Sequence, residues 1–129
     1  MPPISATLTF FCSADLARSR EFYEDTLGLT PAMTTPTALL WHVTGGSFFG
    51  VTSGEGRTPK AGAAILELVV GGDDAVDAWH ERITAAGWTA DPAPQALDGG
   101  GRYFFATDPD GYLVEVLHLP SLTTPAVVS

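Results

Sequence analysis

Short stretches in which apolar and polar positions alternate recur along the chain, and this pattern predicts half-buried β-strands. Between them lie two segments in which apolar residues recur at helical spacing, one from Asp15 to Gly28 and one from Asp74 to Gly87. Each begins with an acid suited to capping a helix and ends with a glycine suited to terminating it. The predicted strands are Ala6–Cys12, Thr37–Val43, Ser47–Thr52, Ala64–Val70, Tyr103–Thr107 and a last strand running from the Asp108–Gly111 turn to Leu119.

The two helical segments are copies of one unit. Asp15 and Asp74 are 59 residues apart, and so are Gly28 and Gly87. An apolar residue and a threonine follow each glycine, and short strands follow in both halves. The chain is therefore an internal duplication of a β-α-β-β-β module, which predicts an α+β fold.

The module boundaries follow from a stretch rich in glycine and proline near the middle of the chain. We expect the first module at residues 1–53, a linker at 54–62, the second module at 63–120 and a loose C-terminal tail at 121–129. The two modules together are expected to form one structural domain.

Composition excludes several classes of function. The chain has 129 residues, is 45% hydrophobic and carries a formal charge of −9 with only six Lys and Arg, which disfavours nucleic acid as a partner. Its apolar runs are too short for a membrane span, so no membrane partner is expected. The single Cys12 and a start without signal-peptide character favour the cytoplasm.

Glu115 is an acid in the middle of the apolar last strand. Because strand side chains alternate between faces, Glu115 shares a face with Leu113 and Leu117. A buried carboxylate without a partner is costly, so Glu115 is expected either to face a cavity or to be paired.

The motifs resemble those of the vicinal oxygen chelate superfamily, which includes glyoxalase I, bleomycin resistance proteins and extradiol dioxygenases. The resemblance rests on Asp15–Tyr23, on Leu27-Gly28-Leu29 and on Asp108–Glu115, and with the repeat it covers about residues 6–119. It implies that the two βαβββ modules form a paired, incomplete barrel enclosing a cavity. It also implies a homodimer, with modules paired within one chain or swapped between chains.

Metal-dependent members of that superfamily take four ligands from four strands, and the resemblance locates these positions here. They fall at Leu8, near Gly50, at either Glu67 or Ile65, and at Glu115. At most two carboxylates and no imidazole remain, a poor donor set for a transition metal. No metal and no other cofactor is therefore expected; a divalent metal is implied only if the chain is a metal enzyme after all.

Other side chains are candidates for contact with a ligand. Glu67 shares a strand face with Ile65 and is expected to point into the cavity beside Glu115, where two close carboxylates would shift one pKa upward. Aromatic side chains offer stacking or cation–π contact, with core packing as the alternative. Arg102 follows a glycine-rich loop and either closes over the cavity or pairs with an acid. The predicted ligand-binding set is Glu115, Glu67, Leu8, Phe10, Trp41, Phe49, Arg102 and Tyr103.

Three functions remain open. The first is a metal-free binding protein, resembling bleomycin resistance proteins, that holds an apolar or cationic antibiotic or metabolite in an aromatic-lined cavity. The second is a divalent-metal-dependent glyoxalase-like lyase or a dioxygenase. The third is a metal-free enzyme in which Glu115 or Glu67 is the catalytic general base.

Overall fold

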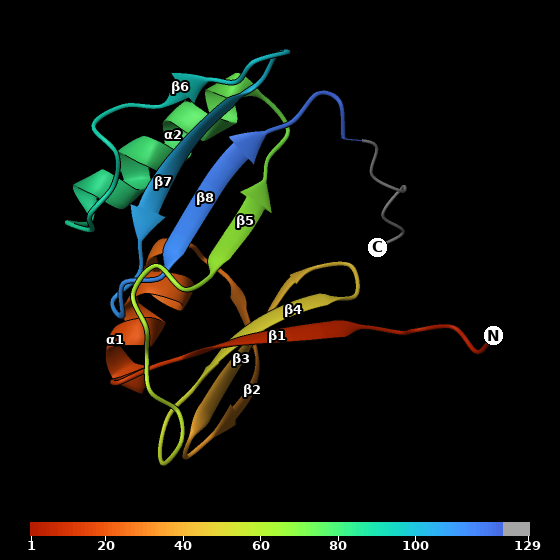
Figure 1. Cartoon of the computed structure of the whole chain (residues 1–129), viewed down its shortest axis with the longest axis vertical. Coiled ribbons are helices and arrows are strands. Elements are labelled where there is room, and N and C mark those ends of the chain that lie inside the picture. Colours follow the sequence, from red (N-terminus) through yellow and green to blue (C-terminus); the bar gives the residue numbers. More distant parts are fainter. Residues whose placement is uncertain (123–129) are drawn as a thin grey trace. The chain divides into compact units, whose positions relative to one another are not determined.

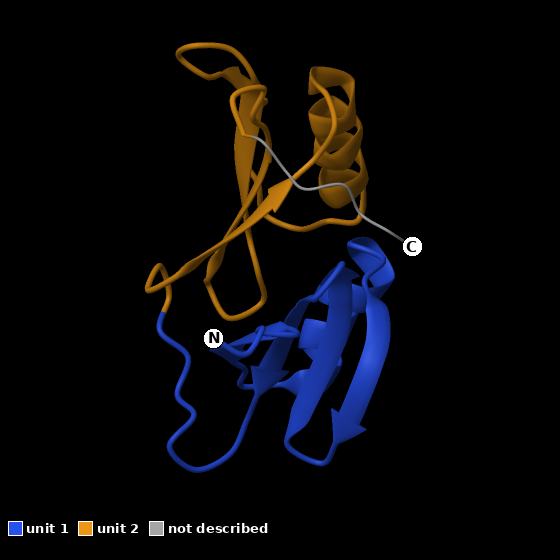
Figure 2. Ribbon diagram, turned by 90° about the vertical axis from the view of Figure 1, so that its right-hand side faces the viewer, with its two compact units in different colours: residues 1–60, 126–129 blue, residues 61–125 orange. Residues whose placement is uncertain are grey.

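The computed structural model describes residues 1–122, and these residues form two compact units (Figures 1 and 2). Unit 1 comprises residues 1–60 and unit 2 begins at Ala61. The boundary lies inside the predicted linker at 54–62. Of the predicted loose tail at 121–129, all but the first two residues lie outside the described residues.

Unit 1 has the β-α-β-β-β order. Its elements are β1 (Thr7–Cys12), α1 (Leu16–Arg20), a π-helical segment η1 (Glu21–Thr26), β2 (Thr30–Thr35), β3 (Ala38–Thr44) and β4 (Ser47–Thr52). The strands form a sheet in the order β1-β4-β3-β2. β1 runs parallel to β4, and the other neighbours are antiparallel.

Unit 2 repeats this architecture. Its elements are β5 (Ile65–Val69), α2 (Asp73–Ala85), β6 (Gln95–Ala96), β7 (Arg102–Thr107) and β8 (Leu113–His118). The sheet order is β5-β8-β7-β6, with β5 parallel to β8. The predicted α+β fold with two βαβββ modules is confirmed. Neither sheet of the described residues closes on itself, and no helix among them has the length and apolar character needed to cross a bilayer.

The core of unit 1 is aromatic. Phe22 and Tyr23 of η1 are fully buried, and the Tyr23 ring lies 5.3 Å from Trp41 and 4.9 Å from Phe49, centroid to centroid. Burying such side chains contributes roughly 1.5–3 kcal/mol each, which fixes the helical segment on one face of the sheet. Residues 1–60 contain no further helix that could cover the opposite face of this sheet.

The core of unit 2 lies between α2 and its sheet. Val76 and Ile83 on one side of α2 are fully buried, as are Phe104 of β7 and Val114 of β8. His80 adds an edge-on ring contact with Phe104 at 5.0 Å. One face of this sheet is therefore committed to α2, and the other is left for different contacts.

The two helices begin differently. The prediction that Asp15 caps the first helix is confirmed, because its carboxylate accepts hydrogen bonds from the backbone N–H groups of Ala17 (3.0 Å) and Arg18 (3.3 Å). The prediction that Asp74 caps the second is wrong. Gly72 is the cap residue, and Asp73 and Asp74 lie in the first turn, where acids are favourable to the helix dipole. The caps are thus 57 residues apart rather than 59.

Candidate functional site

The face of the unit 2 sheet opposite α2 carries both acids that the sequence singled out. We call it open face 2. Strand register aligns residues of β5, β8 and β7 across it in three rows. The rows are Ile65–Leu113–Thr107, Glu67–Glu115–Phe105 and Val69–Leu117–Tyr103.

The central row joins two carboxyl groups and an aromatic ring. Glu67 and Glu115 are directly paired on parallel strands, and Phe105 is paired with Glu115 on its other side. Glu115 is only 8% exposed, whereas Glu67 is exposed. Neighbouring strands lie about 4.8 Å apart, so all three side chains are within reach of one small ligand.

Burial, followed by a side-chain hydrogen bond with Glu67 and the negative charge of Glu67, raises the pKa of Glu115 from 4.5 to about 7. Two carboxyl groups hydrogen-bond only if one of them carries a proton. Glu115 is therefore suited to hold and exchange a proton near neutral pH.

The corresponding face of the unit 1 sheet, open face 1, is apolar at the same place. Leu8 is 51% exposed and Phe10 is 39% exposed. Phe10 is paired with Gly50, and its ring covers that glycine: a Cβ there would lie 2.6 Å from the ring and 2.5 Å from the Leu39 carbonyl oxygen. The backbone at Gly50 has no room for a ligating side chain.

Strand register removes the ambiguity between Ile65 and Glu67. The helix caps are offset by 57 residues, and this offset relates Leu8 to Ile65 and Phe10 to Glu67. Strand pairing supports the same correspondence. Phe10 of β1 pairs with Gly50 of β4, and Glu67 of β5 pairs with Glu115 of β8. The fifth-strand counterpart of Leu8 is therefore Ile65, and Glu67 lies one row further along β5.

Of the four positions that the resemblance assigns to metal ligands, Leu8, Gly50 and Ile65 offer no side-chain donor, and Glu115 offers a carboxyl. Within residues 1–122 no three His, Cys, Asp or Glu side chains gather closely enough to hold a metal ion. Borderline metals such as Zn²⁺ prefer imidazole or thiolate among their ligands. The residues present do not fit such a metal, and we derive no chemistry through one.

Two predicted ligand-binding aromatics belong to the core instead. Trp41 and Phe49 are each 1% exposed and lie on the helix-covered face of the unit 1 sheet. The indole Nε1 of Trp41 donates to the Glu24 carboxylate at 3.1 Å, which satisfies its polar atom in the core. The structure thus removes both residues from the predicted ligand-facing set.

Arg102 is also placed differently from the prediction. Its guanidinium Nε donates to the Asp77 carboxylate of α2 at 2.6 Å, so the side chain lies on the helix side of the sheet. Its neighbour Tyr103 takes the other side and lies on open face 2, with its hydroxyl donating to Gln95 at 3.3 Å. Arg102 therefore pairs with neither Glu67 nor Glu115.

Phe105 is the residue of the central row that the sequence reasoning missed. The sequence already indicated its face, because Phe105 lies two residues from Tyr103 and side chains alternate along a strand. What the sequence lacked was the β7–β8 register, which sets Phe105 rather than Tyr103 beside Glu115.

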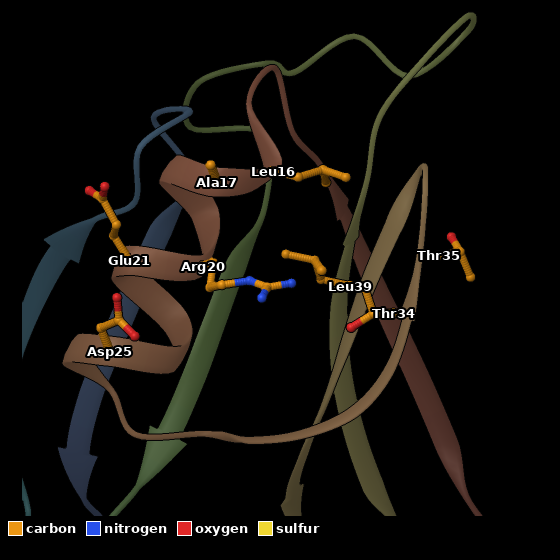
Figure 3. Close-up of a pocket in the computed structure, with 8 residues that line it drawn as sticks. All are labelled: Leu16, Ala17, Arg20, Glu21, Asp25, Thr34, Thr35 and Leu39. Carbon is orange, nitrogen blue, oxygen red and sulfur yellow. The ribbon is translucent and has the colours of Figure 1, made fainter.

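A hollow of about 340 Å³ lies wholly within unit 1, between the first helical segment and strands β2 and β3 (Figure 3). Arg20 extends across it toward Leu39 and Thr34, while the carboxylate of Glu21 turns the other way. No sequence motif indicated this hollow. Its lining residues are Leu16, Ala17, Arg20, Glu21, Asp25, Thr34, Thr35 and Leu39.

Comparison with solved structures supports the fold over nearly the whole chain. A glyoxalase-related enzyme from Fulvimarina pelagi is 23% identical, with a TM-score of 0.81 over 96% of this chain and 94% of that one. Lactoylglutathione lyase from Agrobacterium tumefaciens is 20% identical, with a TM-score of 0.75 over 91% and 95%. The fosfomycin resistance protein from Mesorhizobium loti is 17% identical, with a TM-score of 0.70 over 94% and 95%.

No curated protein matches the chain in sequence. A family model does: the model of the glyoxalase/bleomycin resistance protein/dioxygenase superfamily matches residues 6–116. This range includes both modules, with the Asp15 cap, the glycine of each helix end and Glu115. The chain belongs to the glyoxalase/bleomycin resistance protein/dioxygenase superfamily.

Proposed function

We propose that this protein is a metal-independent small-molecule-binding protein that holds an apolar ligand with a cationic group. The observation that carries the proposal is the row Glu67–Glu115–Phe105 on open face 2. Apolar side chains border this row above and below, including the exposed Ile65 and Val69. Such a surface offers an anionic anchor surrounded by apolar contact area.

The residues of the row contribute in different ways. The carboxylates attract and hydrogen-bond an ammonium or guanidinium group, and charge-assisted hydrogen bonds are roughly twice as strong as neutral ones. The Phe105 ring adds a cation–π contact of about 0.5–2 kcal/mol. The ligand class is therefore that of an amine-bearing antibiotic or metabolite, which the protein would sequester in the cytoplasm.

The ligand and a second copy of the chain are the proposed partners of the apolar side chains that each unit exposes. Leu8, Phe10 and Met33 of unit 1 and Ile65 and Val69 of unit 2 are large apolar side chains that remain exposed in the single chain. Exposed apolar patches commonly mark binding surfaces. Sedimentation of the purified protein tests the proposed homodimer, and a monomer at micromolar concentration would contradict it.

A second candidate is a metal-free enzyme in which Glu115 is the general base, because a pKa of about 7 suits proton transfer at neutral pH. Glu115→Gln would then abolish turnover while a cation still binds to Glu67. A metal-dependent lyase or dioxygenase is less well supported, since three of the four ligand positions lack a donor.

A calorimetric screen tests the binding proposal. Chelator-treated protein is titrated with phenethylamine, and the uncharged 2-phenylethanol provides the matched ligand without a cation. We expect saturable binding of the amine, weakened about tenfold or more in Glu115→Gln, which corresponds to a loss of roughly 1.4 kcal/mol. Glu55→Gln in the exposed linker is the matched control and should bind as wild type. Equal affinity for both ligands would reject the cationic anchor.

A further inference from the structure

We propose that the hollow of unit 1 is a second binding site, which takes a small carboxylate with an apolar body and holds its charged end on Arg20. This site goes beyond the proposed function, because it lies in the other unit and selects a ligand of opposite charge. Its volume of about 340 Å³ is near the lower end of the range of roughly 300–1,000 Å³ found for ligand sites, so the expected ligand is small.

The walls of the hollow are mainly apolar. Leu16 and Ala17 contribute from the first helical segment, and Leu39 contributes from β3. Thr34 is the cross-strand partner of Leu39, so the two side chains leave the same face of the sheet, and Leu39 is only 3% exposed. An aromatic or aliphatic body placed against these side chains removes apolar surface from water, which favours binding.

Arg20 is the basic residue of the hollow. Its side chain extends across the hollow toward Leu39 and Thr34 (Figure 3). It forms no ion pair with any of residues 1–122, whereas nearby Arg18 pairs with Glu21. A guanidinium presents a planar fork of N–H donors that matches the two oxygens of a carboxylate. The position of Arg20 therefore suits a ligand with a carboxylate at one end.

The π-helical segment η1 explains why Arg20 has no internal partner. In an α-helix the side chain four residues beyond Arg20 would be its neighbour, and that residue is the acid Glu24. In η1 the N–H of Leu27 instead donates to the carbonyl oxygen of Phe22, five residues back, at 3.0 Å. The Glu24 carboxylate accepts the indole N–H of Trp41 at 3.1 Å. π-Helical turns are rare and frequently occur at functional sites, and this one directs to the core the acid that would otherwise neutralise Arg20.

Two further carboxylates line the hollow and restrict where an anion binds. Glu21 turns away from the hollow and pairs with Arg18 (Figure 3). Asp25 lies five residues beyond Arg20 and repels an anion placed near it. The carboxylate of the ligand is therefore expected at the guanidinium, with the apolar body directed toward Leu39.

Titration with phenylacetate, followed by amide chemical shifts, tests the site. This ligand has the aromatic body of phenethylamine and 2-phenylethanol but carries a negative charge. We expect saturable shifts centred on Leu16, Arg20 and Leu39, with clearly weaker binding of 2-phenylethanol at the same place. Phenylacetate shifts that centre elsewhere, or equal affinity for the two compounds, would overturn the proposal.

Substitutions identify the side chain that holds the charge. Arg20→Gln should weaken phenylacetate binding about fivefold or more, which corresponds to the loss of one ion pair. Arg20→Lys should weaken it less, since lysine keeps the charge but lacks the planar fork. Arg57→Gln in the exposed linker is the matched control and should bind as wild type.

A substitution at Ala17 tests the hollow itself. Ala17→Leu fills part of the hollow and leaves the guanidinium in place, and both residues favour a helix. It should weaken phenylacetate binding, with the amide spectrum showing that each variant is folded. If Arg20→Gln or Ala17→Leu binds phenylacetate as tightly as wild type, the carboxylate site is rejected whether or not amines bind to open face 2.

Discussion

At the scale of single residues, Glu115 differs from its surroundings because an acid is buried among apolar side chains. Its neighbours on the same strand face are Leu113 and Leu117, and its cross-strand partners are Glu67 and Phe105. Burial and the second acid both disfavour the charged form, so the folded protein holds a proton at Glu115 more tightly than the unfolded chain does.

This difference predicts that Glu115→Gln stabilises the protein above neutral pH. The folded-state pKa is raised from 4.5 to about 7, so the contribution of Glu115 to stability is fully present below pH 4.5 and is lost as the pH rises to 7. The neutral glutamine does not incur this loss, and the variant should exceed wild type by up to about 3 kcal/mol at pH 8.

Chemical denaturation at pH 4 and pH 8 checks the prediction. The difference between variant and wild type should be small at pH 4 and large at pH 8, and Glu55→Gln should follow wild type at both. A difference that does not change with pH would contradict the raised pKa.

The sequence alone predicts the strand face of those site residues whose strands alternate clearly between apolar and polar side chains. Because side chains alternate between the two faces of a strand, the sequence alone places Leu8 and Phe10 on one face of the first strand. It likewise places Glu115 on the face of the last strand that carries Leu113 and Leu117. It failed for Trp41, because Leu39, Leu40 and Trp41 are successive apolar residues and alternation cannot tell the two faces of such a run apart. Only the packing of Tyr23 against Trp41 decides which face the helix covers.

At the scale of elements, strand register and helix caps determine where the site lies. The glycines that end the two helices reveal the repeat at an offset of 59 residues, but the helix caps are 57 residues apart because Gly72 rather than Asp74 caps the second helix. Two acids in succession, Asp73 and Asp74, are both plausible helix starts in sequence. The offset of 57 relates Phe10 to Glu67 and Leu8 to Ile65, so Ile65 rather than Glu67 occupies the fifth-strand ligand position.

The cap assignment predicts unequal effects of two similar substitutions. Asp15→Ala removes a carboxylate that accepts two backbone hydrogen bonds and should destabilise the protein by about 1 kcal/mol. Asp74→Ala removes a first-turn acid with no capping bond and should cost about 0.3–0.5 kcal/mol. Equal losses in urea unfolding would indicate that Asp74 also acts as a cap.

Close packing at Gly50 gives a second element-scale prediction. Gly50→Ala places a Cβ against the Leu39 carbonyl oxygen, which cannot move without disturbing the β3–β4 pairing. We expect a loss of roughly 1–3 kcal/mol, typical of overpacking. Gly71→Ala is the matched control, since its Cβ meets nothing within 4 Å. If thermal unfolding shows both variants equally stable, the contact of β4 with Phe10 and Leu39 is looser than described.

At the scale of the whole molecule, the duplicated βαβββ fold is similar to the folds of a lactoylglutathione lyase and a fosfomycin resistance protein. The fold was predictable because each module repeats the same order of strand, helix, helix-ending glycine and further strands. The function was not, because it depends on which side chains occupy a few strand positions. In this chain those positions are occupied by Leu8, Gly50, Ile65 and Glu115.

The side chains at these positions predict that removal of divalent metals leaves the protein unchanged. Protein purified without an affinity tag should show the same melting temperature with and without chelator, and added Zn²⁺ or Ni²⁺ should not bind stoichiometrically. Glu115→Gln provides the control. A bound equivalent of metal that is lost in this variant would contradict the metal-independent account.

The most direct test of the central claim is amide chemical-shift mapping of this 13.5 kDa protein in chelator, with phenethylamine as the ligand. We predict saturable shifts concentrated on β5, β7 and β8, largest near Glu67, Phe105 and Glu115, and lost in Glu115→Gln. Shifts that appear only after a divalent metal is added, or that centre on the Arg20 hollow of unit 1, would contradict it.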